Sequence, residues 1–162
     1  MSSIHLSVVI PAYNEAARVP STLPQVLRFL DARPDSYEVV VVDSGSTDNT
    51  ASLVEELIRN QPRARLLRCP VNHGKGAAVR TGMLNARGEF VVFTDADLSA
   101  PIAEIDRLLD PLRNGYDVVL GSRALQPEWT HTPWFRRVAG RVFNRFLWLV
   151  TGLPFRDTQC GF

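Results

Sequence analysis

Short valine-rich runs alternate with longer segments of helical periodicity along most of this chain. Continuous apolar runs of this length are typical of strands buried on both faces of a parallel sheet. The strand-like runs are His5–Ile10, Glu38–Val42, Phe90–Thr94 and Asp117–Leu120, with Arg65–Arg68 as a weaker fifth. The helical segments are about Ser21–Ala32, Asp48–Arg59, Ala77–Ala86 and Ile102–Arg113. This alternation predicts an α/β fold, an open and mostly parallel sheet with helices on both faces.

The length and composition of the chain indicate how many domains it forms and which classes of partner it can bind. The chain has 162 residues and is 45% hydrophobic, which suffices for one domain with a buried core. Because it has no internal repeat or linker, residues 1–162 are expected to form a single domain. The net charge of +1 argues against a nucleic-acid partner. Residues 121–162 are more basic than the rest, and such an end can face phosphate or an anionic membrane surface.

Cysteine usage and hydropathy indicate the compartment. Cys69 and Cys160 are too few and too far apart in sequence for a disulfide framework or a zinc site, so a reducing compartment is expected. No signal peptide precedes the first apolar run, and no apolar run reaches the roughly 18 residues that a spanning helix needs. We therefore expect the protein to be cytoplasmic.

Polar residues follow four of the predicted strands. In open parallel sheets, ligands bind outside the carboxyl ends of the strands. The polar segments there are Pro11–Glu15, Asp43–Asp48, Asp95–Asp97 and Gly121–Arg123. Four loops therefore bring polar groups to one rim, which predicts a ligand site.

The strand-forming run that starts at Val91 ends in Asp95-Ala96-Asp97. Two carboxylates this close at the mouth of a buried strand repel each other, unless they are paired or bind a cation. Mg2+ or Mn2+ takes one or two carboxylates and completes its shell with water and substrate phosphate. We therefore predict a metal–diphosphate site with Asp95 and Asp97 as ligands. The alternative is a helix-capping aspartate beside a solvated one.

Lys75, the only lysine of the chain, lies between Gly74 and Gly76. The spacing is not that of a phosphate-binding Walker loop, but it can bring an ammonium and backbone N–H groups to a phosphate at a helix N-terminus. Arg80 follows about one and a half turns later. Both cations either bind diphosphate or only solvate the helix. A dinucleotide oxidoreductase is disfavoured, because Gly45 stands alone where a G-x-G-x-x-G motif would be needed.

These motifs, in this order, resemble the family 2 inverting glycosyltransferases, which have the Rossmann-like GT-A fold. The matching segments are Val8–Glu15, Val41–Asp48, Asn72–Gly76, Asp95–Asp97 and Gly121–Arg123. The resemblance covers essentially the whole chain and is strongest to the polyprenyl-phosphate or dolichyl-phosphate hexosyltransferases. The closing segment, Asp157–Phe162, favours the glucosyl branch. Family members continue past this point, so the resemblance also implies that the chain is truncated at its C-terminus.

The resemblance assigns roles to individual residues. It implies a pocket for the nucleotide base and ribose, made by Pro11, Tyr13, Glu15 and Asp43. Asp43 would accept a hydrogen bond from a ring N–H of uracil or guanine, unless it is a turn residue. Asp95 would contact the nucleoside or the metal, and Asp97 would be the metal ligand proper. Lys75 and Arg80 would serve the diphosphate.

The implied reaction moves a hexose with inversion from a nucleotide sugar to a polyprenyl phosphate, with Mg2+ or Mn2+ on Asp97 assisting departure of the diphosphate. Glucose from UDP-glucose is favoured, and mannose from GDP-mannose is the second choice. A phosphate monoester has a second pKa of about 6 and is largely dianionic at neutral pH, so it needs no general base. Arg123 would hold this anion with its planar fork. Asp157 is either a base for a hydroxyl acceptor or a residue that orders the acceptor.

The stretch Pro133–Gly152 has paired apolar residues at helical spacing and an arginine-rich opposite face. A basic amphipathic helix with tryptophan and phenylalanine can lie in a membrane interface. The alternative is a core-packing helix with solvated arginines. Together with a lipid acceptor, the first interpretation places the protein at the inner face of the membrane.

Two other functions stay open at this point. One is a family 2 transferase that acts on a glycan or another hydroxyl acceptor, which would need a base. The other is a non-catalytic fragment that binds a nucleotide sugar or docks on a membrane, and such a fragment would bind nucleotide without turnover.

Overall fold

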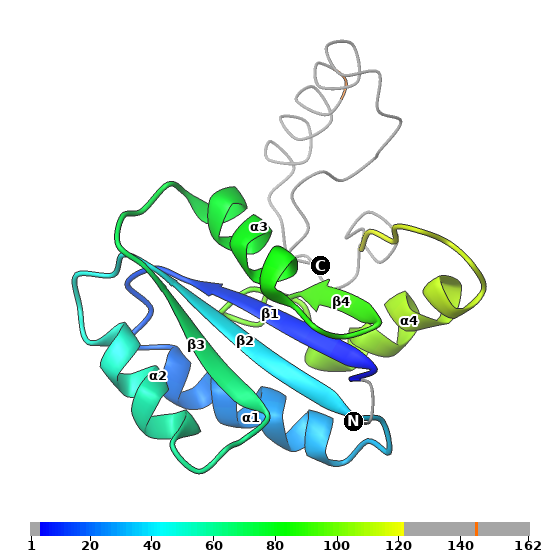
Figure 1. Ribbon diagram of the computed structural model, residues 1–162, viewed down its shortest axis with the longest axis horizontal. Coiled ribbons are helices and arrows are strands. Elements are labelled where there is room, and N and C mark those ends of the chain that lie inside the picture. Colours follow the sequence, from blue (N-terminus) through cyan, green and yellow to red (C-terminus); the bar gives the residue numbers. More distant parts are fainter. Residues whose placement is uncertain (1–3, 122–144, 146–162) are drawn as a thin grey trace, which may run out of the picture. The chain divides into compact units, whose positions relative to one another are not determined.

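The computed structural model describes residues 4–121 and Arg145. Residues up to Asp117 belong to one compact unit, in which strands and helices alternate (Figure 1). The elements in chain order are β1 (Leu6–Ala12), α1 (Val19–Asp31), β2 (Tyr37–Ser44), α2 (Thr50–Ile58), β3 (Ala64–Cys69), α3 (Lys75–Asn85), β4 (Phe90–Phe93), the short 3-10 helix η1 (Ile102–Glu104) and α4 (Ile105–Arg113).

The four strands form one parallel sheet in the order β3-β2-β1-β4. In register, Val9 of β1 lies opposite Val40 of β2 on one side and Phe93 of β4 on the other. Every residue of β1 and β2 is buried, as expected for central strands covered on both faces. The predicted open parallel sheet is thus confirmed, including the weak fifth run, which forms β3.

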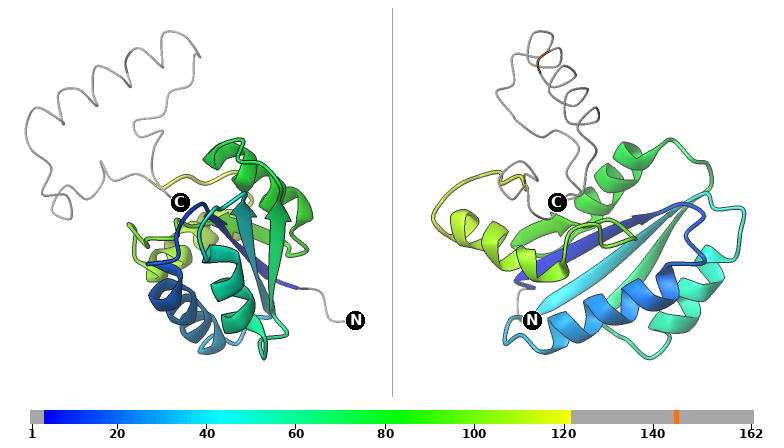
Figure 2. Two further views of the ribbon diagram at one scale, coloured as in Figure 1. Left: turned by 90° about the vertical axis from the view of Figure 1, so that its left-hand side faces the viewer. Right: turned by 180° about the vertical axis from the view of Figure 1, so that it is seen from behind.

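The helices cover both faces of the sheet. The two views of Figure 2 place α3 on one face and α1 and α2 on the other. Helix α1 buries Leu23, Val26, Leu27 and Leu30, and this spacing of three and four residues gives an apolar stripe along one side of a helix. One part of the core therefore lies between the sheet and α1, and a second hydrophobic cluster, formed by Val9, Val40, Val42 and Ala78, lies on the α3 face.

Helix α3 docks differently, through its small residues Ala78 and Gly82. A Cβ added at Gly82 would lie 2.2 Å from Cγ1 of Val9 and 3.0 Å from Cγ2 of Val42. The absence of a side chain at Gly82 therefore lets the helix backbone lie directly on β1 and β2. This close approach also fixes the first turn of α3, which begins at Lys75.

The strand predicted at Asp117–Leu120 is wrong, because these residues form no strand. Val118 is 72% exposed and Leu120 is 44% exposed. Strand preference of a valine-rich run reflects burial against neighbouring strands, and these side chains are not buried. The predicted helix at 102–113 is divided into η1 and α4. Among the described residues, no helix combines the length and the apolar character needed to cross a membrane.

Candidate active site

A pocket of about 300 Å3 opens at the carboxyl ends of β1, β2 and β4. Its size is at the lower end of the range for small-molecule sites. The predicted site residues that line it are Pro11, Tyr13, Glu15, Lys75, Asp95 and Asp97. These residues come from three separate segments of the sequence, which the parallel sheet brings together at one rim.

Asp95 and Asp97 lie on a tightly held turn after β4. The N–H of Leu98 donates to the Asp95 carbonyl oxygen at 3.1 Å, and Leu98 has a φ of +48°, a left-handed conformation uncommon for leucine. The N–H of Ser99 donates to Asp97 Oδ1 at 2.9 Å. The turn thus holds both carboxylates at the pocket.

Helix α1 supports this turn through a residue that the sequence analysis missed. The buried Thr22 hydroxyl donates to the carbonyl oxygen of Ala96, between the two aspartates, at 2.8 Å. A threonine in the first turn of a helix gives no sequence signal for a contact 74 residues away. Thr22 therefore positions the aspartate pair without contacting the pocket itself.

Lys75 contacts the aspartate pair from the opposite side. Its Nζ lies 2.5 Å from Asp95 Oδ1 and 5.8 Å from the centre of the Phe93 ring. Gly74, with a φ of +90°, turns the chain into α3 and puts Lys75 at the first position of the helix. An ammonium and a helix N-terminus therefore meet at one end of the pocket, and both favour an anion.

The donor set of the pocket fits a hard divalent cation. Asp95 and Asp97 offer carboxylate oxygens, and no group of three or more His, Cys, Asp or Glu side chains among the described residues could hold a metal by itself. Mg2+ and Mn2+ are commonly bound by one or two carboxylates and completed by substrate phosphate and water. A zinc site of three or four protein ligands does not fit this set.

Asp43 lies at the carboxyl end of β2 and is only 5% exposed. Its Oδ1 is buried and has no hydrogen-bond partner in the described structure. In register it lies opposite Ala12. Ala12 and the next residue, Ser44, line the pocket, whereas Asp43 itself lies next to the lining and is not part of it. A buried carboxylate oxygen without a donor is unfavourable, so this position suits a ligand that brings an N–H group.

The loops that follow β1 and β2 are joined by side-chain hydrogen bonds. Asn14 Oδ1 accepts from the N–H of Thr47 at 2.9 Å, and the Ser46 hydroxyl accepts from the N–H of Asn14 at 3.0 Å. Asp48 Oδ1 accepts from the Thr50 hydroxyl at 2.5 Å, and the hydrogen bonds that Asp48 accepts from Thr50 and from the N–H of Ala16 hold its pKa below the usual value. The polar residues of the loops after β1 and β2 therefore hydrogen-bond the two loops to each other and hold Tyr13 and Glu15 in place.

Arg18 is a cation that the sequence analysis missed; it does not line the pocket but pairs with Glu15, which does. Its guanidinium donates to Oε2 of the pocket residue Glu15 at 2.7 Å. This hydrogen bond, the charge of Glu15 and the charge of Asp97 raise the pKa of Arg18. The spacing of three residues between Glu15 and Arg18 was the available sequence signal, because the turn before α1, in which the Arg18 N–H donates to the Glu15 carbonyl at 2.9 Å, brings the two side chains together.

Other predicted site residues are not brought into the pocket. Arg80 is exposed on α3 and is not among the residues that line it, so its role at the diphosphate stays a prediction. Arg123, Asp157 and nearly all of the segment 133–152 lie outside the described residues. Their assignments also stay predictions.

Comparison with known proteins agrees with this geometry. Residues 7–161 match the sequence profile described as Glycosyl transferase family 2. The chain belongs to this family. The match spans the strands, the pocket and the C-terminal segment, so the resemblance inferred from five short motifs is confirmed for the whole chain.

Two curated relatives give a closer comparison. The chain is 35% identical to a dolichyl-phosphate beta-glucosyltransferase of Dictyostelium discoideum, over 100% of this chain and 54% of the relative. It is 39% identical to the Drosophila melanogaster protein of the same name, over 99% of this chain and 54% of the relative. The family 2 chain thus spans about half the length of these relatives.

A solved structure shares the fold and holds ligands. It is a mannosyltransferase from Pyrobaculum calidifontis in complex with GDP-Man and Mn2+, with a TM-score of 0.53 and 38% identity, over 59% of this chain and 28% of that chain. The family 2 fold predicted from the sequence, an open parallel sheet with flanking helices, is confirmed by this similarity and by the topology.

Proposed function

We propose that this chain carries the donor site of an inverting, metal-dependent hexosyltransferase that moves glucose from UDP-glucose to dolichyl or another polyprenyl phosphate. The observation that carries the proposal is the pocket in which Asp95, Asp97 and Lys75 meet at the carboxyl ends of the strands. The names of the two curated relatives support glucose as the sugar and dolichyl phosphate as the acceptor. The mannosyltransferase with GDP-Man and Mn2+ supports a nucleotide-sugar donor and a divalent cation.

The pocket and the adjacent Asp43 would offer separate groups for each part of the donor. Asp43, with its unpartnered oxygen, would accept from the ring N–H of uracil, and Tyr13, which is 45% exposed, would flank the base or ribose. The Lys75 ammonium and the N-terminus of α3 would hold the diphosphate. Asp95 and Asp97 would hold Mg2+ or Mn2+, which neutralises the charge that develops on the departing nucleoside diphosphate.

The acceptor half of the site is proposed from its chemistry. A lipid phosphate carries its own nucleophilic oxygen and is largely dianionic at neutral pH, since its second pKa is about 6. The enzyme then has to hold two anions together rather than remove a proton, and Arg123 is the residue proposed for this task. Asp157 would order the acceptor. The basic segment 133–152 would lie on the inner face of the membrane, where the lipid acceptor is found.

A transfer assay with labelled donors tests this function. Purified protein is mixed with UDP-glucose or GDP-mannose and with polyprenyl phosphate or polyprenyl alcohol in detergent, with Mn2+ or with chelator. We expect transfer of the label from UDP-glucose to the phosphate acceptor when Mn2+ is present and no transfer when chelator is present. Asp97→Asn should abolish this transfer. Arg107→Gln, which removes a surface ion pair with Glu104, serves as the matched control.

The other outcomes separate the alternatives. Transfer to the alcohol would indicate a hydroxyl-acceptor transferase, and transfer from GDP-mannose would place the chain in the mannosyl branch. Metal-dependent binding of the donor without any transfer would indicate a donor-binding fragment.

A further inference from the structure

Within the described part of the chain, the Lys75 ammonium forms an ion pair with one of the candidate metal ligands. Lys75 Nζ lies 2.5 Å from Asp95 Oδ1, and the side chains are 54% and 23% exposed. Both residues line the pocket. Any divalent cation held by Asp95 and Asp97 must therefore displace the Lys75 ammonium or bind next to it.

We propose that Lys75 is a resident counter-ion that neutralises Asp95 while the pocket holds no donor, and that it moves to the diphosphate when the nucleotide binds. This inference rests on the proposed function. Its consequence is that divalent metal and nucleotide bind with positive coupling, because the nucleotide removes the lysine that competes with the metal.

Electrostatics give the direction of this coupling. With Lys75 on Asp95, the pair of carboxylates carries a reduced net negative charge, and like-charge repulsion disfavours a second cation there. A nucleoside diphosphate adds negative charge beside the first turn of α3, where the lysine stem begins. Lysine is a compact charge on a flexible four-carbon stem, so it can change partner without a movement of the helix.

Arg18, which pairs with the pocket residue Glu15, does not substitute for Lys75. Arg18 is hydrogen-bonded to Glu15 at 2.7 Å and extends from the start of α1 rather than from α3. A half-exposed ion pair contributes little to stability, so replacing Lys75 leaves the fold intact and isolates its effect on metal binding.

Manganese titration followed by electron paramagnetic resonance measures this coupling directly, because free Mn2+ gives the signal. Each protein is titrated without nucleotide and with saturating UDP. Lys75→Met removes the charge and keeps the chain length, whereas Lys75→Arg keeps the charge. Arg68→Gln is the matched control, since Arg68 is also about half exposed but pairs with Glu55, outside the pocket.

We expect Lys75→Met to bind Mn2+ about tenfold more tightly than wild type without nucleotide, and to show a correspondingly smaller gain when UDP is added. By reciprocity, UDP affinity in Lys75→Met should depend less on Mn2+. Lys75→Arg and Arg68→Gln should resemble wild type. If Lys75→Met binds Mn2+ without nucleotide no more tightly than wild type, and wild type binds Mn2+ and UDP together, the inference about Lys75 is wrong and the proposed function is unaffected. A wild type that binds no UDP contradicts the proposed function as well.

Discussion

At the scale of single residues, the site depends on groups that hold other groups in place. Thr22 lies on the buried side of α1, and its hydroxyl donates to the Ala96 carbonyl between the two aspartates. Asp43 offers a buried oxygen without a partner. Thr22 affects the geometry of the site, and Asp43 affects its affinity for the nucleotide base.

Thr22→Val should weaken metal-dependent UDP binding. Valine has the shape of threonine but leaves the carbonyl of the buried Ala96 without a donor, which should also cost about 1–3 kcal/mol of stability. Thr22→Ser should restore both properties, because it returns the hydroxyl. Urea unfolding and calorimetry with UDP and Mn2+ measure the two effects. A loss of stability with an unchanged dissociation constant would restrict Thr22 to a structural role.

Asp43→Asn should reduce UDP affinity by about tenfold or more, since a hydrogen bond to a charged group contributes about 1.5–3 kcal/mol. The protein should be no less stable, because a neutral amide is easier to bury than an unpartnered carboxylate. Calorimetry with UDP at saturating Mn2+ compares the affinities of the two proteins. Equal UDP affinity in the two proteins would remove Asp43 from the nucleotide pocket.

At the scale of elements, α3 connects the core to the site. Its backbone packs on β1 and β2 at Gly82, and its first residue carries the ammonium that contacts Asp95. The position of the cation thus depends on how closely the helix lies on the sheet.

Gly82→Ala should destabilise the protein by about 1–3 kcal/mol through overpacking. Helix propensity alone predicts the opposite sign, a gain of about 1 kcal/mol. Gly76→Ala is the matched control, because a Cβ at Gly76 meets nothing within 4 Å, and it should be neutral or stabilising. The urea midpoints of the two variants decide the sign. An equal gain in both would show that α3 does not lie as close to the sheet as described.

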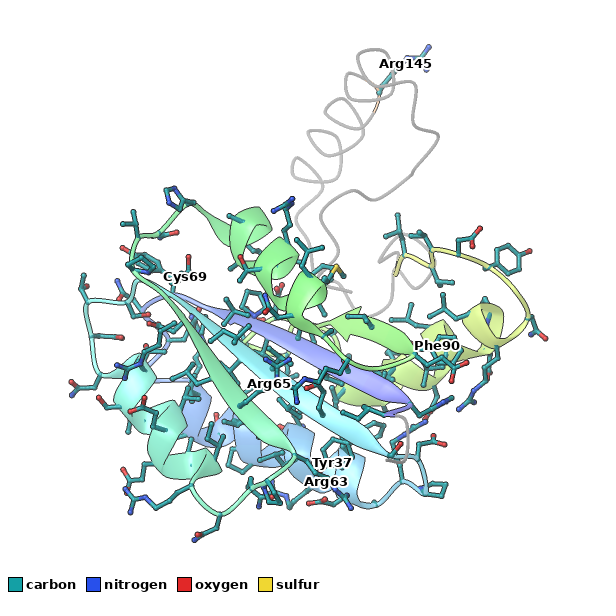
Figure 3. All side chains as sticks on the ribbon, viewed as in Figure 1. Tyr37, Arg63, Arg65, Cys69, Phe90 and Arg145 are labelled. Atoms are coloured by element: carbon teal, nitrogen blue, oxygen red, sulfur yellow. The ribbon has the colours of Figure 1, made fainter. Side chains whose placement is uncertain are left out.

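At the scale of the whole molecule, a buried carboxylate joins the elements at the end of the sheet opposite to the pocket. Glu38 accepts hydrogen bonds from Ser7 at 2.8 Å, from Arg65 Nε at 3.0 Å and from the N–H of Arg87 at 2.6 Å. Arg65, on β3 (Figure 3), also donates to the carbonyl of Asn85, the last residue of α3. This cluster ties three strands and a helix together.

The cluster predicts how stability depends on pH. Burial alone would raise the pKa of Glu38, but hydrogen bonds from Arg65, Ser7 and the Arg87 N–H outweigh it and lower the pKa. The resulting stabilisation is complete above the unfolded-state pKa of about 4.3 and is lost as the pH falls through that value toward the lower folded-state pKa.

Glu38→Gln should therefore be less stable at neutral pH by about 2 kcal/mol, and its stability should fall less steeply with pH in the acid range. Urea unfolding of both proteins from pH 7 to about pH 3 measures the two slopes. Parallel curves would show that Glu38 does not contribute to acid denaturation.

The sequence predicted the parts of the molecule whose signal is local. Valine runs marked the buried strands, and the aspartate pair and the lone lysine marked the pocket. The contact between Thr22 and Ala96 could not be predicted, because it joins residues whose neighbourhood exists only in the folded chain. The strand predicted at Asp117–Leu120 was wrong for the same reason. Strand formation there depends on pairing with neighbouring strands, which a local sequence pattern does not show.

The most direct test of the central claim is calorimetric titration of the protein with UDP-glucose, once with Mn2+ and once with chelator, beside the same titrations of Asp97→Asn. We expect UDP-glucose binding that depends on Mn2+ and that is lost or strongly weakened in Asp97→Asn. Equal affinity with and without the metal, or no binding of UDP-glucose in either condition, would contradict the claim that this pocket is a metal-dependent donor site.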